Sequence, residues 1–157
     1  MQWAWIPLVA VGPLEFGMRP DEVAAALDEP TRRNRLGVNA DTYFPDPGVT
    51  AYFTDAGHLA AVALCASTGP QVSLEDVPLV RQVPSKTVER VFSYADLHGI
   101  KAAWGPSGDP ELTDLGLFLR AQRVGDIALS RPLFLFSGWA GDMLEECIPD
   151  SEWVASC

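Results

Sequence analysis

The chain has 157 residues, 48% of them hydrophobic, and a formal charge of −10 at pH 7. This hydrophobic content excludes wholesale disorder, and the length predicts one domain over residues 1–157. The negative charge disfavours binding to nucleic acid or to anionic membranes, because their phosphate groups repel it. It favours a basic protein partner instead.

Residues 1–17 are apolar but lack the features of a signal peptide. No positive charge precedes the apolar run, and Pro7 and Pro13 interrupt it. The run is also too short to cross a bilayer as a helix. We therefore expect a first strand in this region and a cytoplasmic protein.

The three cysteines, Cys65, Cys147 and Cys157, have no C-x-x-C spacing. Cys65 ends an apolar run, so we expect it to be a small buried hydrophobic residue. Because the number of cysteines is odd and their spacing fits no recognised pattern, we expect no disulfide framework.

Residues 12–27 predict a short helix that starts abruptly. Pro20 suits the first helical turn, because its fixed φ is already helical and its missing N–H would have no partner there. Asp21 and Glu22 place negative charge where the helix dipole favours it. Val23 begins an apolar stripe at i, i+3 and i+4, which predicts one buried face.

A β-hairpin is predicted after this helix. Residues 49–53 are β-branched and aromatic, residues 54–57 carry turn chemistry, and residues 58–65 resume an apolar run. A Gly-Pro pair then breaks the chain, and residues 71–74 predict a short third strand.

A longer helix is predicted in the second half. Ser85 is a natural N-cap, and Val88 begins an apolar stripe at i, i+3, i+4 and i+7 that ends at Ala95. Gly99 suits the left-handed position that ends many helices, and Ile100 supplies the apolar contact that accompanies it. The following segments predict a strand at 100–104, a loop at 105–114, a hairpin of 115–121 with 126–130, and a strand at 133–136.

The two halves of the chain share one plan, in which a helix, a hairpin and a strand follow each other. The helix starts are 65 residues apart, the hairpin starts 66 and the hairpin turns 68, by subtraction of 20 from 85, 49 from 115 and 57 from 125. We therefore predict pseudo-repeats at about residues 12–80 and 81–137, followed by an acidic segment at 138–157. Neither half can bury a helix stripe and a sheet face alone, so the predicted fold is α+β, an antiparallel sheet with both helices on one face.

The segment GPLEFGMRPDEVAAAL, followed by GVTAYFTDAGHLAAVAL, resembles the pattern "G-M-x-x-x-E-V, then hairpin" of tandem helix–hairpin repeats. Such repeats occur in β-lactamase-inhibitor-like and outer-membrane-assembly-lipoprotein-like folds. The chain is also similar to small acidic actinobacterial proteins, which include candidate immunity proteins for polymorphic toxins. It departs from the lipoproteins in lacking a lipobox cysteine, and from the secreted inhibitors in lacking a signal peptide and paired cysteines. The resemblance implies a binding module rather than an enzyme and carries over no functional residue.

No catalytic residue, metal site or cofactor is predicted. The two histidines, His58 in a hairpin turn and His98 at a helix end, have structural explanations, and no G-x-S-x-G motif occurs. Cysteine and histidine positions show no ligand spacing, and phosphate-binding or dinucleotide motifs are absent from the sequence.

An alternative function stays open: a small enzyme or ligand-binding protein of a biosynthetic cluster, with an apolar cavity and carboxylate groups. Asp109, Glu111 and Asp114 cluster in one loop, where turn formation is the simpler explanation. Trp104 and Phe118 are candidate cavity-lining residues, although packing in the core explains them as well.

The C-terminal region is the candidate partner-binding surface. Beyond Arg131 the chain has no Lys or Arg, while carboxylates accumulate beside two tryptophans. Such a mixture resembles an interaction hot spot, and a solvated tail with its tryptophans folded back on the sheet is the alternative. The predicted partner-binding residues are Trp139, Asp142, Glu145, Glu146, Asp150 and Trp153.

The leading hypothesis is thus a cytoplasmic protein-binding module, an immunity or inhibitor protein that occludes a basic partner such as a toxin. A homodimer that pairs exposed sheet edges is a further hypothesis.

Overall fold

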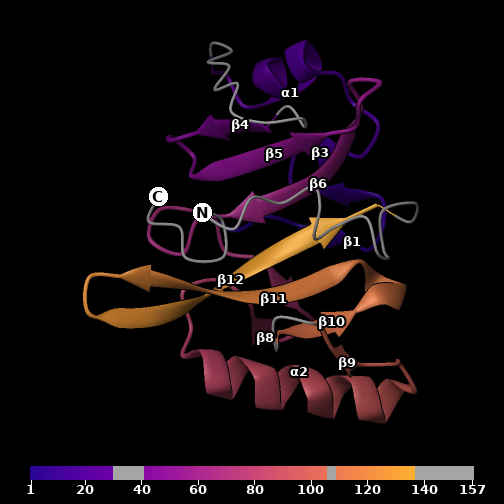
Figure 1. Ribbon diagram of the computed structural model, residues 1–157, viewed down its shortest axis with the longest axis vertical. Helices are drawn as coiled ribbons and strands as arrows, with labels where there is room; N and C mark the ends of the chain where they lie inside the picture. The colour runs from indigo at the N-terminus through magenta and orange to yellow at the C-terminus, as the bar shows by residue number, and fades with distance from the viewer. Residues whose placement is uncertain (30–40, 106–108, 137–157) are drawn as a thin grey trace.

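The structure is a computed structural model that describes residues 1–29, 41–105 and 109–136 (Figure 1). In these ranges the helices are α1 (Pro20–Ala26), α2 (Pro84–His98) and the 3₁₀ turn η1 (Thr113–Leu115). The strands are β1 (Trp5–Ile6), β2 (Ala10–Val11), β3 (Leu14–Glu15), β4 (Asp41–Phe44), β5 (Val49–Phe53), β6 (Leu59–Leu64), β7 (Ser73–Leu74), β8 (Val77–Pro78), β9 (Ala103–Trp104), β10 (Pro110–Leu112), β11 (Leu117–Val124) and β12 (Ile127–Leu135). The predicted α+β class is confirmed.

Three sheets organise these strands. The main sheet has seven strands in the order β4-β5-β6-β12-β11-β10-β9, and all of its neighbours are antiparallel. Strands β1-β2-β3 and β7-β8 form two small additional sheets that the sequence reading did not separate. In Figure 1, α1 lies at the β4 end of the main sheet and α2 at the β9 end.

Helix α1 begins at Pro20, as predicted. The backbone N–H of Arg19 donates to the Glu22 carboxylate at 2.8 Å, which caps the first turn. The predicted apolar stripe is partly wrong, because Ala24 is buried beside Val23 while Ala26 is exposed. A helix of seven residues has only two turns, so a small rotation decides which neighbour of Val23 meets the core.

Helix α2 is confirmed, but its predicted N-cap is wrong. The N-cap is Val83, because Pro84 takes the first helical position to which its fixed φ is suited, and Ser85 lies inside the helix. The predicted end is confirmed: Gly99 has φ of 65°, and the N–H of Ile100 donates to the Ala95 carbonyl at 2.8 Å.

The core of the described residues divides into two clusters on opposite faces of the main sheet. The first cluster contains Val23 and Ala24 of α1, Val91 and Ala95 of α2, and residues of all three sheets. The second cluster is smaller and consists of Tyr52, Ala61, Ala63, Phe118, Leu133 and Leu135. From Ala61 to Leu64 the residues of β6 alternate between the two clusters, and all six residues of the strand are buried. This explains why the sequence of β6 is a continuous apolar run.

Strand β12 corrects another prediction, because it is one strand where the sequence indicated two. Pro132 lies inside it, in register with Leu119 of β11. The N–H of Ser130 donates to the Gln82 carbonyl, on the side of β12 that faces away from β11. Pro132 is two residues after Ser130, so its backbone nitrogen also faces away from β11. The N–H that proline lacks would therefore not have bonded to β11, and the strand continues.

Cys65 follows β6 and is disulfide-bonded, with 1% of its surface exposed. The prediction that it is buried is correct, and the expectation of no disulfide is wrong for this residue. The other two cysteines of the sequence, Cys147 and Cys157, lie outside the described residues.

None of the helices in the described part of the chain is long and apolar enough to span a membrane. The single domain with two pseudo-repeats stays a prediction.

Candidate functional site

The predicted partner-binding residues lie outside the part of the chain that the structure describes. They are Trp139, Asp142, Glu145, Glu146, Asp150 and Trp153. Among the described residues, the candidate sites are two hollows in the surface.

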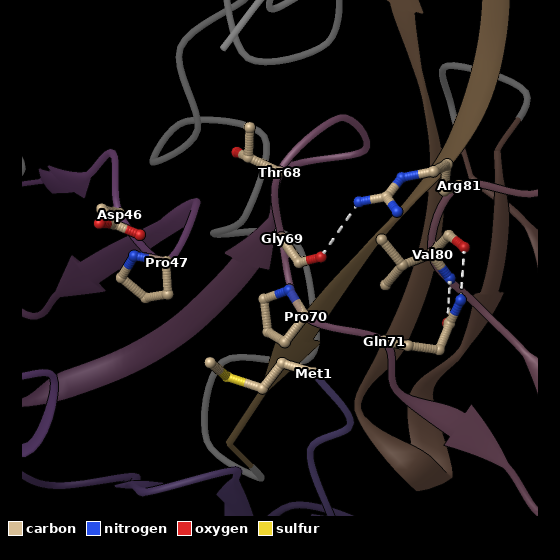
Figure 2. A pocket seen from close by; sticks show the side chains of 9 residues that line it. All are labelled: Met1, Asp46, Pro47, Thr68, Gly69, Pro70, Gln71, Val80 and Arg81. Atoms are coloured by element: carbon tan, nitrogen blue, oxygen red, sulfur yellow. Dashed lines mark hydrogen bonds between the residues drawn. The ribbon is translucent and has the colours of Figure 1, made fainter.

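The first hollow, shown in Figure 2, is a polar pocket of about 240 Å³. Its lining consists of Met1, Asp46, Pro47, Thr68, Gly69, Pro70, Gln71, Val80 and Arg81. The Gln71 side chain bonds to the backbone across the pocket wall: its Nε2 donates to the Val80 carbonyl at 2.8 Å, and its Oε1 accepts from the N–H groups of Leu79 and Val80 at 3.1 and 2.8 Å. These bonds hold the segment after β8 against the segment before β7.

Arg81 closes the other side of this polar pocket. Its backbone has φ of 61°, a conformation that residues other than glycine seldom adopt. Its Nε donates to the Ala66 carbonyl at 3.0 Å and its Nη2 to the Ser67 carbonyl at 2.8 Å. Asp46 approaches the pocket from the opposite side (Figure 2). The polar groups that bond here serve mainly to join loops, which indicates a structural clamp.

The second hollow, which we name the Trp104 groove, has a volume of about 200 Å³ and lies between the first turns of α2 and the strands beside them. It is lined by Pro84, Ser85, Thr87, Val88, Trp104, Asp109, Pro110, Leu119, Arg120, Ala121 and Ser130. Trp104 is 63% exposed on β9, the last strand of the main sheet, and its ring stacks on Phe92 of α2 with 5.2 Å between ring centroids. The groove therefore presents a large aromatic surface that the described residues only partly cover.

A nearly buried ion pair belongs to the same lining. Arg120 Nη1 donates to Asp109 Oδ2 at 2.8 Å, and only 6% of the Arg120 side chain is exposed. Burial raises the pKa of Asp109, and the charge and hydrogen bond of Arg120 oppose that rise. The Asp109 carboxylate is thus paired with Arg120 at a position where burial disfavours its negative charge.

The three loop carboxylates that the sequence singled out do not form one site. Asp109 bonds to Arg120, Glu111 lies on β10 and Asp114 is exposed on η1. Among the described residues, no group of three or more histidine, cysteine or acidic side chains could hold a metal ion.

The structure also separates the two aromatic residues proposed as cavity lining. Trp104 lines the groove, whereas Phe118 belongs to the second core cluster. Sequence reasoning missed the contact between Trp104 and Phe92. The signal for it was the apolar stripe of α2, in which Phe92 is half-buried.

Acid–base groups for catalysis are sparse at the groove. Neither His58 nor His98 lines it, and His98 instead stacks on Tyr94 at 4.0 Å. The Ser130 hydroxyl donates to the Leu79 carbonyl at 2.7 Å and accepts from the Gln82 N–H at 2.9 Å, so its bonding capacity is largely used. The arrangement is suited to binding an apolar or aromatic group.

Comparison with protein-family models, with curated proteins and with solved structures gave no match.

Proposed function

We propose that the chain is a protein-binding module and that the Trp104 groove forms part of its binding surface. The observation that carries the proposal is the exposed Trp104 ring, held in place by Phe92 beside an apolar hollow. Tryptophan is enriched among the residues that contribute most to protein–protein affinity, because it buries a large area with little loss of side-chain freedom.

The size of the groove supports a side chain as its occupant. Pockets for whole metabolites or drug-sized ligands usually enclose about 300–1,000 Å³, and the Trp104 groove has about 200 Å³. One apolar or aromatic side chain of a partner fits such a volume. This favours a binding module over the alternative of a small enzyme or metabolite carrier.

The net charge of the chain favours a basic protein as its partner. The net charge of −10 attracts basic proteins over a distance set by ionic strength. In this proposal the acidic residues from Asp142 to Asp150 add attraction and Trp139 and Trp153 add contact area, so the chain acts as an inhibitor or immunity protein that covers a basic active site. The proposed location is the cytoplasm.

Affinity capture from the native host tests this proposal. Tagged full-length chain is used as bait at low and high salt, and stoichiometric partners are identified by mass spectrometry. The variant Trp104→Ala is compared with Leu97→Ala, a matched control on α2 whose side chain is 82% exposed and lies outside the groove.

We expect one stoichiometric basic protein at low salt, lost at high salt. Trp104→Ala should weaken its binding by about 2 kcal/mol or more, which is roughly 30-fold, while Leu97→Ala should bind like the wild type. Capture of the bait alone would contradict the proposed function, and equal binding by both variants would remove the groove from it.

A further inference from the structure

The lining of the Trp104 groove contains polar groups that the fold does not use. Among the residues that the structure describes, neither the indole N–H of Trp104 nor the hydroxyl of Ser85 takes part in a hydrogen bond. The other two hydroxyl groups of the lining are bonded, since Thr87 Oγ1 donates to the Val83 carbonyl at 3.2 Å and Ser130 is bonded as described above. Trp104 and Ser85 can therefore each donate a hydrogen bond to an occupant of the groove.

One face of α2 borders the groove with apolar and acidic side chains. Positions i, i+3, i+4 and i+7 of this face are occupied by Ser85, Val88, Glu89 and Phe92. Ser85 and Val88 line the groove, and Phe92 stacks on Trp104. Glu89 is exposed and forms no ion pair with another residue of the described ranges. A carboxylate thus lies beside the groove, in a chain whose net charge is −10.

The groove is short along the helix. Its lining residues on α2 extend from Pro84 to Val88, a rise of about 6 Å at 1.5 Å per residue. A segment in the polyproline II conformation rises about 3.1 Å per residue, so two of its residues span this length. The occupant is therefore a compact group on an extended backbone.

A proline-rich segment matches this combination of features. The polyproline II backbone has no internal hydrogen bonds, so its carbonyl groups are free to accept from Trp104 and Ser85. Proline has no N–H group that would need an acceptor in the groove. The Trp104 ring, whose position Phe92 fixes, presents the flat aromatic surface on which such segments dock. Because the polyproline II conformation is formed before binding, the segment loses little conformational freedom.

We propose that the Trp104 groove binds a proline-rich segment of the basic partner, with a proline ring on Trp104 and a Lys or Arg beside Glu89. This inference rests on the proposed use of the groove as a binding surface, and it names the class of segment that the groove takes. The charge of Glu89 and the net charge of −10 complement a segment in which basic residues flank the prolines.

Titration of the ¹⁵N-labelled full-length chain with synthetic peptides, followed by NMR, tests the proposal. The probe is the capped peptide Arg-Pro-Pro-Pro-Pro-Pro-Arg. Two control peptides keep both arginines and carry alanine, or alternating alanine and leucine, in place of proline. The chain has five tryptophans, so the indole signal of Trp104 is identified by its absence from the spectrum of Trp104→Phe.

We expect the proline peptide to shift the Trp104 indole signal and to bind about tenfold more tightly than either control peptide, because its backbone is ordered before binding. Equal or tighter binding of a control peptide would overturn proline as the occupant. An unchanged Trp104 signal would overturn the groove as the site.

Substitutions test the two donors. Trp104→Phe keeps an aromatic ring but removes the N–H, so it should weaken peptide binding about fivefold, and Ser85→Ala about threefold. Urea midpoints establish that each variant is folded. Unchanged affinity in both variants would contradict the proposed hydrogen bonds.

The charge contact is tested by Glu89→Gln, which should weaken peptide binding about threefold at low salt. Asp96→Asn is the matched control, because it removes the same charge from an exposed site on the same helix, seven residues beyond Glu89. It should bind like the wild type. Equal binding by Glu89→Gln and Asp96→Asn would remove the contact with Glu89 from the proposal.

The peptide titration and the affinity capture fail independently of each other. A captured basic partner that depends on Trp104, together with peptides that do not bind, would overturn the proline-rich segment and leave the binding module in place. A proline peptide that binds at Trp104, together with capture of the bait alone, would support the segment and contradict the proposed inhibitor or immunity function.

Discussion

The polar pocket and the Trp104 groove use their side chains in opposite ways. In the polar pocket, Gln71 and Arg81 bond to backbone groups, and their hydrogen bonds hold loops together. In the Trp104 groove, Trp104 keeps most of its surface exposed although Phe92 fixes the position of its ring. The difference teaches that a polar hollow with bonded side chains indicates stability, whereas an exposed, oriented aromatic ring indicates binding.

Gln71→Ala should give the largest effect on stability. It leaves the buried N–H of Val80 without its acceptor, which costs about 2 kcal/mol. Gln82→Ala is the matched control, because Gln82 Nε2 also donates to the Val80 carbonyl and its loss costs only about 1 kcal/mol. Urea denaturation measures both. Equal stability of the two variants would show that Gln71 does not clamp the loops around the polar pocket.

Charge reversal at Asp142, Glu145 and Glu146 should weaken partner binding by about tenfold at low salt and flatten its salt dependence. The effect should appear mostly in the association rate, because exposed charges steer encounter. Surface plasmon resonance at several ionic strengths measures it with the partner that capture identifies. Unchanged association would exclude these carboxylates from the binding surface.

Trp104→Ala should change the free energy of unfolding by less than about 1 kcal/mol, because an exposed ring gains little from burial. The same substitution is expected to weaken partner binding strongly, and this contrast is what separates the groove from the clamp. Thermal and urea unfolding measure the stability. A loss as large as that of Gln71→Ala would place Trp104 with the structural residues.

Asp109→Asn should have the smallest effect at neutral pH, within about 1 kcal/mol, because burial already disfavours the Asp109 charge and the Asn carbonyl can still accept a hydrogen bond from Arg120. Burial raises the pKa of Asp109 above its ordinary 3.8 despite Arg120, so the folded protein binds this proton more tightly than the unfolded chain. The stabilisation from that proton is complete below pH 3.8 and is lost as the pH rises through the raised pKa.

The direction of this pH dependence is tested by measuring the free energy of unfolding from pH 4 to 7 for the wild type and for Asp109→Asn. The wild type should lose stability relative to the variant as the pH rises. The opposite slope would show that Arg120 outweighs burial at this site.

Local patterns explain which elements the sequence predicted well. Helix α2 follows from its apolar stripe and from Gly99, and the β5–β6 hairpin follows from an apolar run on each side of turn residues. The predicted ends of helices and strands were wrong where a proline determined the observed end. Pro84 moved the N-cap of α2, and β12 runs through Pro132 where the sequence predicted two strands, at 126–130 and 133–136.

The candidate site was much less accessible to prediction. Trp104 was identified as a candidate lining residue, but its stacking on Phe92 joins residues 12 positions apart on different elements, by subtraction of 92 from 104. The bond between Asp109 and Arg120 depends on the pairing of β10 with β11, which composition does not reveal. The predicted partner-binding segment, residues 138–157, lies outside the described residues.

The sequence by itself determined the α+β class, the α2 helix and the main hairpins, because periodicity and turn residues act within a few positions of each other. Only the tertiary structure decided the features that depend on pairing between segments far apart in the sequence. It joined β6 to β12, placed Arg120 opposite Arg131, and set Trp104 at the last strand of the main sheet. The exposed fraction of a side chain and the distance between two charges are properties of the assembled sheet, because both depend on residues that are distant in the sequence.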